Sequence, residues 1–216
     1  MEKVAVIGAN GQLGSDLVKV LRQQKWPVTP LLHRQIEVKD RRSVSLCLSR
    51  IKPNVVINTA AFHDLVACEQ RPQEAFEVNA LGVGNLAYWC RENQATLVHF
   101  STDYVFGGDE KRRPYQETDP VAPQSVYAIS KLAGELLVQT IVPRYFLIRT
   151  SGLYGTAGSR VKGSNFVEKR IAQAKLGETI YMVADQILSP TYTMNLAQNV
   201  AALLKIKKYG LYHMSS

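Results

Sequence analysis

The sequence predicts an α/β fold, a doubly wound parallel sheet of the Rossmann type with a small, incomplete C-terminal region. Short β-rich runs alternate with helical stretches along the 216 residues, and this alternation is typical of right-handed βαβ crossovers. A glycine-rich loop directly follows the first apolar run, which is where such folds bind a ligand. We expect a Rossmann domain at residues 1–150 and a partial second region at residues 151–216, interleaved with the last strands of the sheet.

Each element is predicted from a short local pattern. The expected strands are residues 3–7, 28–32, 55–58, 96–101 and 145–150, with a further extended segment at residues 180–183. The expected helices are residues 12–24, 42–51, 72 to about 93, 126–141, 165–175 and 193–205. Pro30 removes a backbone donor from the second strand, so we expect that strand at an edge of the sheet. Pro72 is suited to the first turn of its helix.

The composition is that of an ordinary globular protein, with 46% hydrophobic and 20% charged residues. No apolar run approaches the roughly 18 residues of a transmembrane helix, and the first apolar run is too short for a signal peptide. Three cysteines without a Cys-x-x-Cys pair indicate neither a disulfide framework nor a metal site. We therefore expect a reduced, cytoplasmic protein without a membrane partner.

The net charge of +8 admits two interpretations. Basic clusters could contact nucleic acid, but no nucleic-acid-binding motif accompanies them. Solvated helix and loop faces explain them better, and part of the charge can attract an anionic diphosphate ligand. We expect no nucleic-acid partner.

A loop with the spacing G-x-x-G-x-x-G follows the first predicted strand and opens the first predicted helix. Three glycines alone could form a tight turn, but this strand–loop–helix setting is typical of dinucleotide binding. The glycines allow a sharp turn and a close approach to a pyrophosphate, while the helix N-terminus offers N–H groups and a positive dipole. The residues expected to contact the cofactor here are Gly8, Asn10, Gly11, Gln12, Leu13 and Gly14.

The end of the second strand indicates which nicotinamide cofactor binds. NAD-binding folds usually place an acid there for the ribose 2′-hydroxyl, whereas this chain has no acid until Glu37. Arg34 can instead form bidentate bonds with the 2′-phosphate of NADP. The alternative is that Arg34 is a solvated loop residue. We expect NADPH, with NADH as the second possibility.

A Tyr-x-x-x-Lys pair begins the helix predicted at residues 126–141. The four-residue spacing places Tyr127 and Lys131 on one helical face. We expect the lysine ammonium to lower the tyrosine pKa, so that Tyr127 acts as a general acid toward a ketone oxygen that receives hydride. Thr102 directly follows the strand predicted at residues 96–101, at the edge where ligands bind in such sheets, and can hold the same oxygen.

Together these motifs resemble the extended short-chain dehydrogenase/reductases, and within them the dTDP-4-dehydrorhamnose reductase family. Besides the glycine loop, the resemblance is carried by Asn58-Thr59-Ala60-Ala61-Phe62-His63, Val78-Asn79-Ala80-Leu81-Gly82, Ser101-Thr102-Asp103-Tyr104-Val105-Phe106-Gly107, Tyr127-x-x-x-Lys131, Arg149-Thr150-Ser151 and Asp185-Gln186-x-x-Ser189-Pro190-Thr191. It covers the chain from residue 1 to residue 216.

The resemblance implies NADPH-dependent reduction of a 4-keto nucleotide-sugar, of the type that converts dTDP-4-dehydrorhamnose to dTDP-rhamnose, in a possible homodimer. It implies a catalytic triad of Thr102, Tyr127 and Lys131, with Lys131 also holding the nicotinamide ribose. It places Ala60, Ala61 and Asn79 along the cofactor cleft, although Asn79 could simply bond backbone nearby. It assigns substrate contacts to Phe62, His63, Asp103, Tyr104 and Asn165.

Three departures from the family pattern bear on the substrate. The family usually has an acid where this chain has Val66, and a tryptophan that packs on the substrate where it has Gly152. Family members also continue well beyond Met214, with helices that close the substrate pocket. We therefore expect normal NADPH binding with weak substrate affinity and slow turnover.

Other functions remain open, both enzymatic and non-catalytic. A nucleotide-sugar dehydratase would need an Asp-Glu pair after Thr102, and the chain has Asp103-Tyr104 instead. A 4-epimerase uses the same tyrosine and lysine with a tightly held NAD. A non-catalytic regulatory subunit, similar to the β-subunit of methionine adenosyltransferase, would bind a dinucleotide without chemistry.

Overall fold

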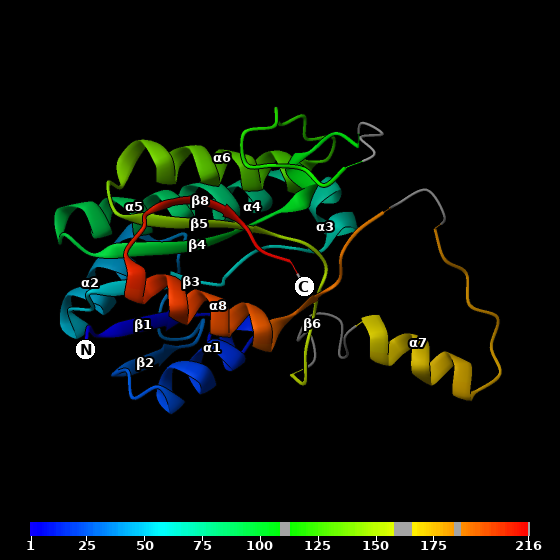
Figure 1. Ribbon diagram of the computed structural model, residues 1–216. Helices are drawn as coiled ribbons and strands as arrows, with labels where there is room; N and C mark the ends of the chain where they lie inside the picture. Colours follow the sequence, from blue (N-terminus) through cyan, green and yellow to red (C-terminus); the bar gives the residue numbers. More distant parts are fainter. Residues whose placement is uncertain (109–112, 158–165, 184–186, 216) are drawn as a thin grey trace.

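The computed structural model describes residues 1–108, 113–157, 166–183 and 187–215. In this part of the chain, six parallel strands form a sheet in the order β2-β1-β3-β4-β5-β8, with helices on both faces (Figure 1). The prediction of a doubly wound parallel sheet is confirmed.

The elements have the following bounds. The main sheet contains β1 (Val4–Ile7), β2 (Val28–Leu31), β3 (Val55–Asn58), β4 (Thr96–Thr102), β5 (Tyr145–Thr150) and β8 (Gly210–His213). A separate pair is formed by β6 (Leu153–Tyr154) and β7 (Thr191–Tyr192). The α-helices are α1 (Gln12–Gln23), α2 (Arg41–Ile51), α3 (Leu65–Gln70), α4 (Pro72–Phe76), α5 (Gly82–Glu92), α6 (Val126–Ile141), α7 (Phe166–Lys175) and α8 (Thr193–Ile206). A π-helical turn, η1 (Glu77–Leu81), joins α4 to α5, and a 3-10 turn, η2 (Asp103–Val105), follows β4.

The strands differ from the sequence prediction at the C-terminal end. β2 is an edge strand, as Pro30 predicted, because a residue without an N–H is tolerated where no second neighbour needs it. Residues 180–183 form no strand, and Tyr181, Met182 and Val183 are all exposed. The last strand of the sheet is instead β8, which pairs with β5. Its four residues begin with a glycine and are too short a run to be recognised from periodicity.

The helix predicted from residue 72 to about residue 93 is divided into three parts. Pro72 opens α4 as predicted, but the chain then passes through η1 before α5 begins at Gly82. A π turn inserts one extra residue into the helical ladder, and such turns are frequent at functional sites. Asn79 lies inside it.

Two apolar layers hold the helices on the sheet. On one face, α1 and α8 pack against each other and over residues such as Val6 and Ile148. On the other face, α2, α5 and α6 cover residues such as Val56 and Leu97. Since all six strands are parallel, their carboxyl ends meet at one edge, and the chain reverses its direction of winding between β1 and β3. That switch point is where ligands bind in open α/β sheets.

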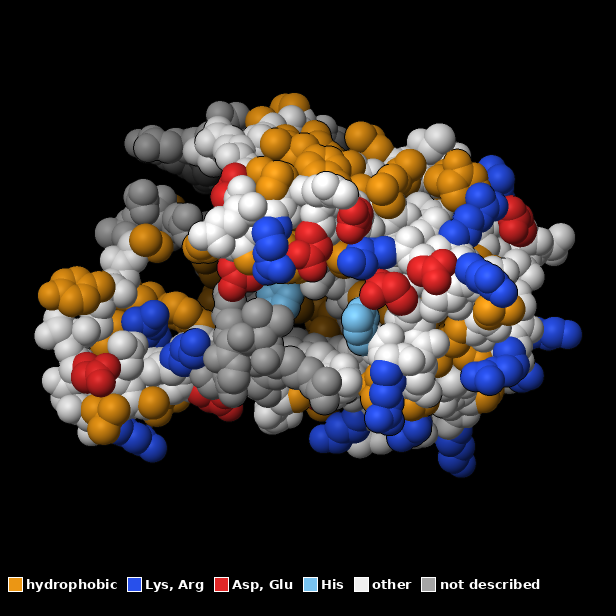
Figure 2. Space-filling model, turned by 180° about the vertical axis from the view of Figure 1, so that it is seen from behind, with side chains coloured by type: hydrophobic (Ala, Val, Ile, Leu, Met, Phe, Trp, Pro, Cys, Tyr) orange, Lys and Arg blue, Asp and Glu red, His pale blue; other side chains and the backbone are white. Residues whose placement is uncertain are grey.

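Outside the sheet, α7 stands apart from the body and has no buried residue (Figure 1). In Figure 2, apolar side chains gather along the top of the molecule, the side on which α6 lies in Figure 1; Ile129 and Leu136 of α6 are exposed. The homodimer stays a prediction. Among the described helices, none has the length and hydropathy needed to cross a membrane.

The helix α6 lies very close to η1 where the two cross. A Cβ added at Gly134 would overlap the backbone carbonyl oxygen of Asn79, which cannot move away as a flexible side chain could. At Gly84 of α5, a Cβ would instead lie 3.3 Å from Leu137 Cδ1, the end of a flexible side chain.

We predict that Gly134→Ala lowers the free energy of unfolding by about 1–3 kcal/mol, the usual cost of overpacking. Gly84→Ala is the matched control, and we expect it to change stability by less than about 1 kcal/mol, because better helix propensity offsets the mild crowding. Urea unfolding followed by circular dichroism measures both. Equal effects of the two substitutions would show that the α6–η1 contact is not tight.

Candidate functional site

The glycines of the turn between β1 and α1 lie very close to neighbouring segments of the chain. Gly8 has a φ of 74°, and a Cβ there would lie 2.6 Å from Thr59 Oγ1 at the end of β3. Thr59 in turn donates to the carbonyl oxygen of Ile7 at 2.7 Å. A Cβ at Gly14 would collide with the carbonyl oxygen of Gly8, so the start of α1 can lie against the turn only without a side chain.

The N-terminus of α1 has the properties of an anion site. Its N-cap, Gly11, is extended and supplies no side-chain cap to the first N–H groups of the helix. The side-chain nitrogen of Gln12 is buried and has no hydrogen-bond partner in the described structure. Leu13 is part of the apolar core, so only its backbone can face a ligand. Uncapped N–H groups at a helix N-terminus suit a pyrophosphate, and the residues present therefore fit a dinucleotide.

Arg34 lies beside this loop. The carbonyl oxygen of Leu31, the last residue of β2, accepts from the N–H groups of Gly8 and Ala9 at 3.0 and 3.2 Å. This fixes the end of β2 next to the turn, and Arg34 follows three residues later with an exposed side chain. The nearby acid, Glu37, receives bonds from His33 Nε2 at 2.7 Å and from the N–H of Lys39 at 3.1 Å.

The side chain of Asn79 fixes the loop after β3 through hydrogen bonds. Its Oδ1 accepts from the N–H of Phe62 at 2.9 Å, and its Nδ2 donates to the Phe62 carbonyl at 2.8 Å and to Ser130 Oγ at 3.0 Å. The sequence places Asn79 along the cofactor cleft, but its side chain is fully buried and both ends of the amide are engaged within the protein. It holds the loop that carries the half-buried Ala60 and Ala61.

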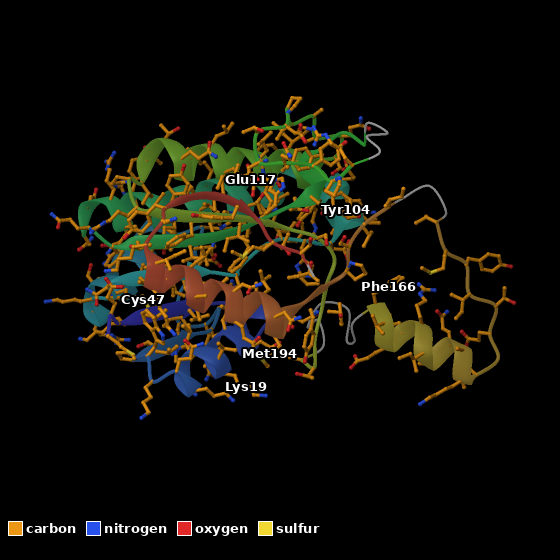
Figure 3. All side chains as sticks on the ribbon, viewed as in Figure 1. Lys19, Cys47, Tyr104, Glu117, Phe166 and Met194 are labelled. Carbon is orange, nitrogen blue, oxygen red and sulfur yellow. The ribbon has the colours of Figure 1, made fainter. Side chains whose placement is uncertain are left out.

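Thr102 and Tyr127 meet at the carboxyl end of β4. Thr102 is buried, its hydroxyl donates to Asp103 Oδ1 at 3.2 Å, and its oxygen accepts from the N–H of Tyr104 at 3.2 Å. The Thr102 side chain also acts on the pKa of Tyr127, so the two hydroxyl groups lie near each other. The rings of Tyr104 and Tyr127 make an edge contact with centroids 6.0 Å apart. Figure 3 shows Tyr104 at this end of the sheet, near α3.

The Tyr127 pKa corrects one expectation. Burial raises this pKa above its ordinary value, and the Thr102 side chain opposes the rise only in part, while Asp103 adds to it. The prediction that Lys131 lowers the Tyr127 pKa is wrong, because the lysine side chain turns toward β4. The phenol is therefore neutral at physiological pH, which is the form that can donate a proton.

Lys131 is almost completely buried, and its side chain extends from α6 to β4. Its Nζ donates to the carbonyl oxygen of Phe100 at 2.6 Å and lies 3.4 Å from His99 Nε2. Burial lowers the Lys131 pKa to about 8, although Glu135 on the same helix opposes the shift. Burial and the neighbouring Lys131 hold the His99 pKa well below its ordinary value, so this imidazole is neutral.

Four of the residues assigned to the substrate, Phe62, His63, Asp103 and Tyr104, follow β3 or β4 at this end of the sheet. Phe62 is half-buried beneath the guanidinium of Arg71, 4.9 Å from the ring centroid, and His63 is exposed. Burial raises the pKa of Asp103. Tyr104 is partly exposed. Asn165 lies outside the described residues.

Sequence reasoning missed the polar groups that support this site from a distance. Ser130 links Asn79 to the carbonyl oxygen of Tyr127, to which its hydroxyl donates at 2.8 Å. Glu135 and Arg149 form a buried ion pair with three contacts of 2.7 to 3.2 Å. No local motif marks such pairs, because their partners are distant in sequence.

A comparison with protein families gives a match over the whole chain. The model described as the RmlD substrate binding domain matches residues 1–216. The chain belongs to this RmlD family.

Named relatives of this RmlD-family chain include enzymes of sugar metabolism. The spore coat polysaccharide biosynthesis protein SpsK of Bacillus subtilis is 38% identical over 100% of this chain and 74% of its own length. The dTDP-4-keto-6-deoxy-D-glucose reductase of Streptomyces niveus is 38% identical over 98% of this chain and 72% of its own.

A solved structure of the same kind is also similar. The dTDP-4-dehydrorhamnose reductase of Bacillus anthracis, in complex with NADP, superposes with a TM-score of 0.93 at 36% identity. The superposition covers 100% of this chain and 74% of that one. The resemblance inferred from the motifs is confirmed.

We predict a pH-dependent stability for this RmlD-family protein that depends on Lys131. Between pH about 8 and 10.5, the unfolded chain holds more protons on this lysine than the folded chain, so stability rises with pH in that range. In Lys131→Met this contribution is absent. From pH 8 to pH 9.5, the stability of the unsubstituted protein relative to the variant should increase by about 1–2 kcal/mol.

Urea unfolding of both proteins at each pH measures the difference. The bond to the Phe100 carbonyl is also lost in the variant, but loss of that bond alone gives a constant offset. Parallel stability curves for the two proteins across this pH range would contradict the low pKa of Lys131.

Proposed function

We propose that this protein is an NADPH-dependent reductase of a 4-keto nucleotide-sugar, of the type that converts dTDP-4-dehydrorhamnose to dTDP-rhamnose. The observation that carries the proposal is that Thr102 and Tyr127 lie together at the carboxyl ends of the strands, the same end of the sheet as the glycine turn. The reductase names of its relatives and the NADP bound by one of them support the same activity.

The cofactor is held by backbone and by one cation in this proposal. The turn at Gly8 and Gly11 lets the pyrophosphate lie on the N-terminus of α1, where no side chain competes for the N–H groups. Arg34 binds the 2′-phosphate, since its side chain is exposed beside the turn and Glu37 is engaged by His33. Bound NADPH supplies the hydride, and NADH remains the weaker alternative.

The protein supplies the proton and the position of the ketone. In this proposal the sugar carbonyl oxygen lies between the Thr102 and Tyr127 hydroxyls, and Thr102 donates to it in place of Asp103. The raised pKa of Tyr127 keeps its phenol protonated until the oxygen gains negative charge, and an alkoxide is more basic than a phenolate. The resemblance assigns Lys131 to the nicotinamide ribose, and in the structure its Nζ donates to the Phe100 carbonyl.

The sugar and nucleotide lie on the residues around this edge. Phe62, His63, Asp103, Tyr104 and Asn165 are the proposed substrate contacts. Asp103 adjoins Thr102, and Phe62 is fixed by both bonds of Asn79 to its backbone. The protein is proposed to act in the cytoplasm on this soluble substrate.

A panel of 4-keto-dTDP sugars tests the activity directly. Oxidation of NADPH on addition of the purified protein, with stoichiometric formation of the reduced sugar, is the expected result. A 4-epimerase would instead carry tightly bound NAD through purification and consume no NADPH. A dinucleotide-binding regulatory subunit would bind the cofactor without turning over any member of the panel.

We predict that Tyr127→Phe abolishes turnover while NADPH binding changes less than about twofold, because only the proton donor is removed. The matched control is Tyr145→Phe, which removes a hydroxyl from the first residue of β5, at the opposite edge of the sheet. The control should retain nearly full activity. Retention of more than a few per cent of activity by Tyr127→Phe would refute the assignment of the proton donor.

We predict that Arg34→Ala weakens NADPH binding by about 1–3 kcal/mol, the range for losing a charge-assisted hydrogen bond, and scarcely changes NADH binding. Arg50→Ala, on the last turn of α2 at the far edge of the sheet, removes the same charge away from the site. Calorimetric titration with each cofactor measures both variants. Equal losses for NADPH and NADH would exclude Arg34 from the 2′-phosphate site.

A further inference from the structure

Lys131 meets a buried pair of polar side chains on two neighbouring strands. Asn58 ends β3 and His99 lies in β4, and the two are partners in the sheet register, so their side chains lie on the same face. Asn58 Nδ2 lies 3.3 Å from His99 Nδ1, and His99 Nε2 lies 3.4 Å from Lys131 Nζ. Asn58, His99 and Lys131 are all at most 2% exposed.

The orientation of the Asn58 amide is fixed by the backbone. Its Oδ1 accepts from the N–H of Ala60 at 3.1 Å, so the amide nitrogen is the atom that faces His99. An amide nitrogen can only donate, and His99 Nδ1 must therefore accept. The neutral imidazole has one proton, which then lies on Nε2 and points toward Lys131.

This tautomer distinguishes the two states of Lys131. An ammonium can only donate, so it makes its bond to the Phe100 carbonyl but faces a second donor at His99. A neutral amine can donate to Phe100 and accept from His99 Nε2–H at once. The hydrogen-bond pattern therefore favours release of a proton from Lys131.

We propose that Asn58 and His99 are positioning residues for Lys131: Asn58 fixes the His99 tautomer, and His99 thereby controls how readily Lys131 gives up its proton. The proposed role of this control rests on the reductase activity proposed above. The resemblance assigns Lys131 to the nicotinamide ribose, so this control decides whether a cation or a neutral amine is present at that contact.

Charged groups on the surrounding elements act on the protonation of Lys131 and Tyr127, some favouring and some opposing loss of the proton. Glu135 on α6 favours the ammonium, and Arg149 on β5 pairs with Glu135 at 2.7 Å. Asp103 on η2 and Cys68 on α3 act on Tyr127. Burial favours the amine, in the same direction as His99.

The first test needs neither cofactor nor substrate. In protein labelled with ¹⁵N-histidine, nitrogen chemical shifts report which ring nitrogen of each imidazole carries the proton, and the spectrum of His99→Gln assigns the His99 signals. We expect a neutral His99 with its proton on Nε2 throughout the neutral range. A proton on Nδ1, or a charged imidazole, overturns the inference.

The second test moves the proton by an isosteric change. In Asn58→Asp, one carboxylate oxygen still accepts from Ala60, while the other accepts from the imidazole, so the His99 proton should move to Nδ1. Nε2 then accepts from the Lys131 ammonium. Titration of Lys131, followed by NMR of ¹³C-lysine, should shift upward by about one pH unit or more, a tenfold change in proton affinity.

The added charge of the aspartate needs its own control. Asn58→Asp in a His99→Phe background keeps that charge and removes the imidazole, and its effect on Lys131 should be clearly smaller than in the presence of His99. Equal shifts in both backgrounds overturn the role of the tautomer. An Nδ1 proton in a protein that reduces the keto-sugar refutes this inference alone, whereas an Nε2 proton without reductase activity supports the coupling and refutes the proposed function.

Discussion

The contact between α6 and η1 is the constraint on which the site depends. At Gly134, α6 lies directly on the backbone carbonyl of Asn79, a distance possible only without a side chain. The amide of Asn79 then reaches Ser130 on one side and the backbone of Phe62 on the other. One helix crossing therefore fixes the loop after β3 relative to the first turn of α6.

The same crossing sets the position of Tyr127, the proposed proton donor. Ser130 bonds the carbonyl oxygen of Tyr127, so the first turn of α6 is tied to the π turn as well as to its own cap, Ser125. Tyr127 then meets Thr102 at the end of β4. A π turn suits this task because it rotates one residue out of the regular helical phase, and Asn79 thereby bonds two separate segments.

Much of the fold, and part of the site, could be predicted from the sequence. Apolar runs and the glycine loop give β1, β3 and the start of α1, since these patterns are local. The placement of Thr102 and Tyr127 at one edge follows from parallel topology. The geometry of η1 could not be predicted, because the sequence pattern from Pro72 onward indicates only a continuous helix.

The direction of the Lys131 side chain shows why the remaining features could not be predicted. A spacing of four residues places Tyr127 and Lys131 on one face of a helix, and from that alone an effect of the ammonium on the tyrosine is the natural expectation. The tertiary structure offers the ammonium a buried carbonyl oxygen, that of Phe100, and the side chain turns to it. The partners of Lys131 on β4, His99 and Phe100, are 32 and 31 positions before it, beyond any local pattern.

Glu135 explains why the imidazole can influence Lys131 at all. The two residues are one turn apart on α6, and an unpaired carboxylate there would hold the lysine firmly as an ammonium. Arg149 binds both oxygens of Glu135 through Nε and Nη2, and this pair is almost fully buried. A carboxylate that is already neutralised by a guanidinium exerts a weaker field on a neighbouring amine. In the proposed coupling, the ion pair thus leaves the balance between amine and ammonium to burial and to His99, so that groups in the sheet interior control the charge of Lys131.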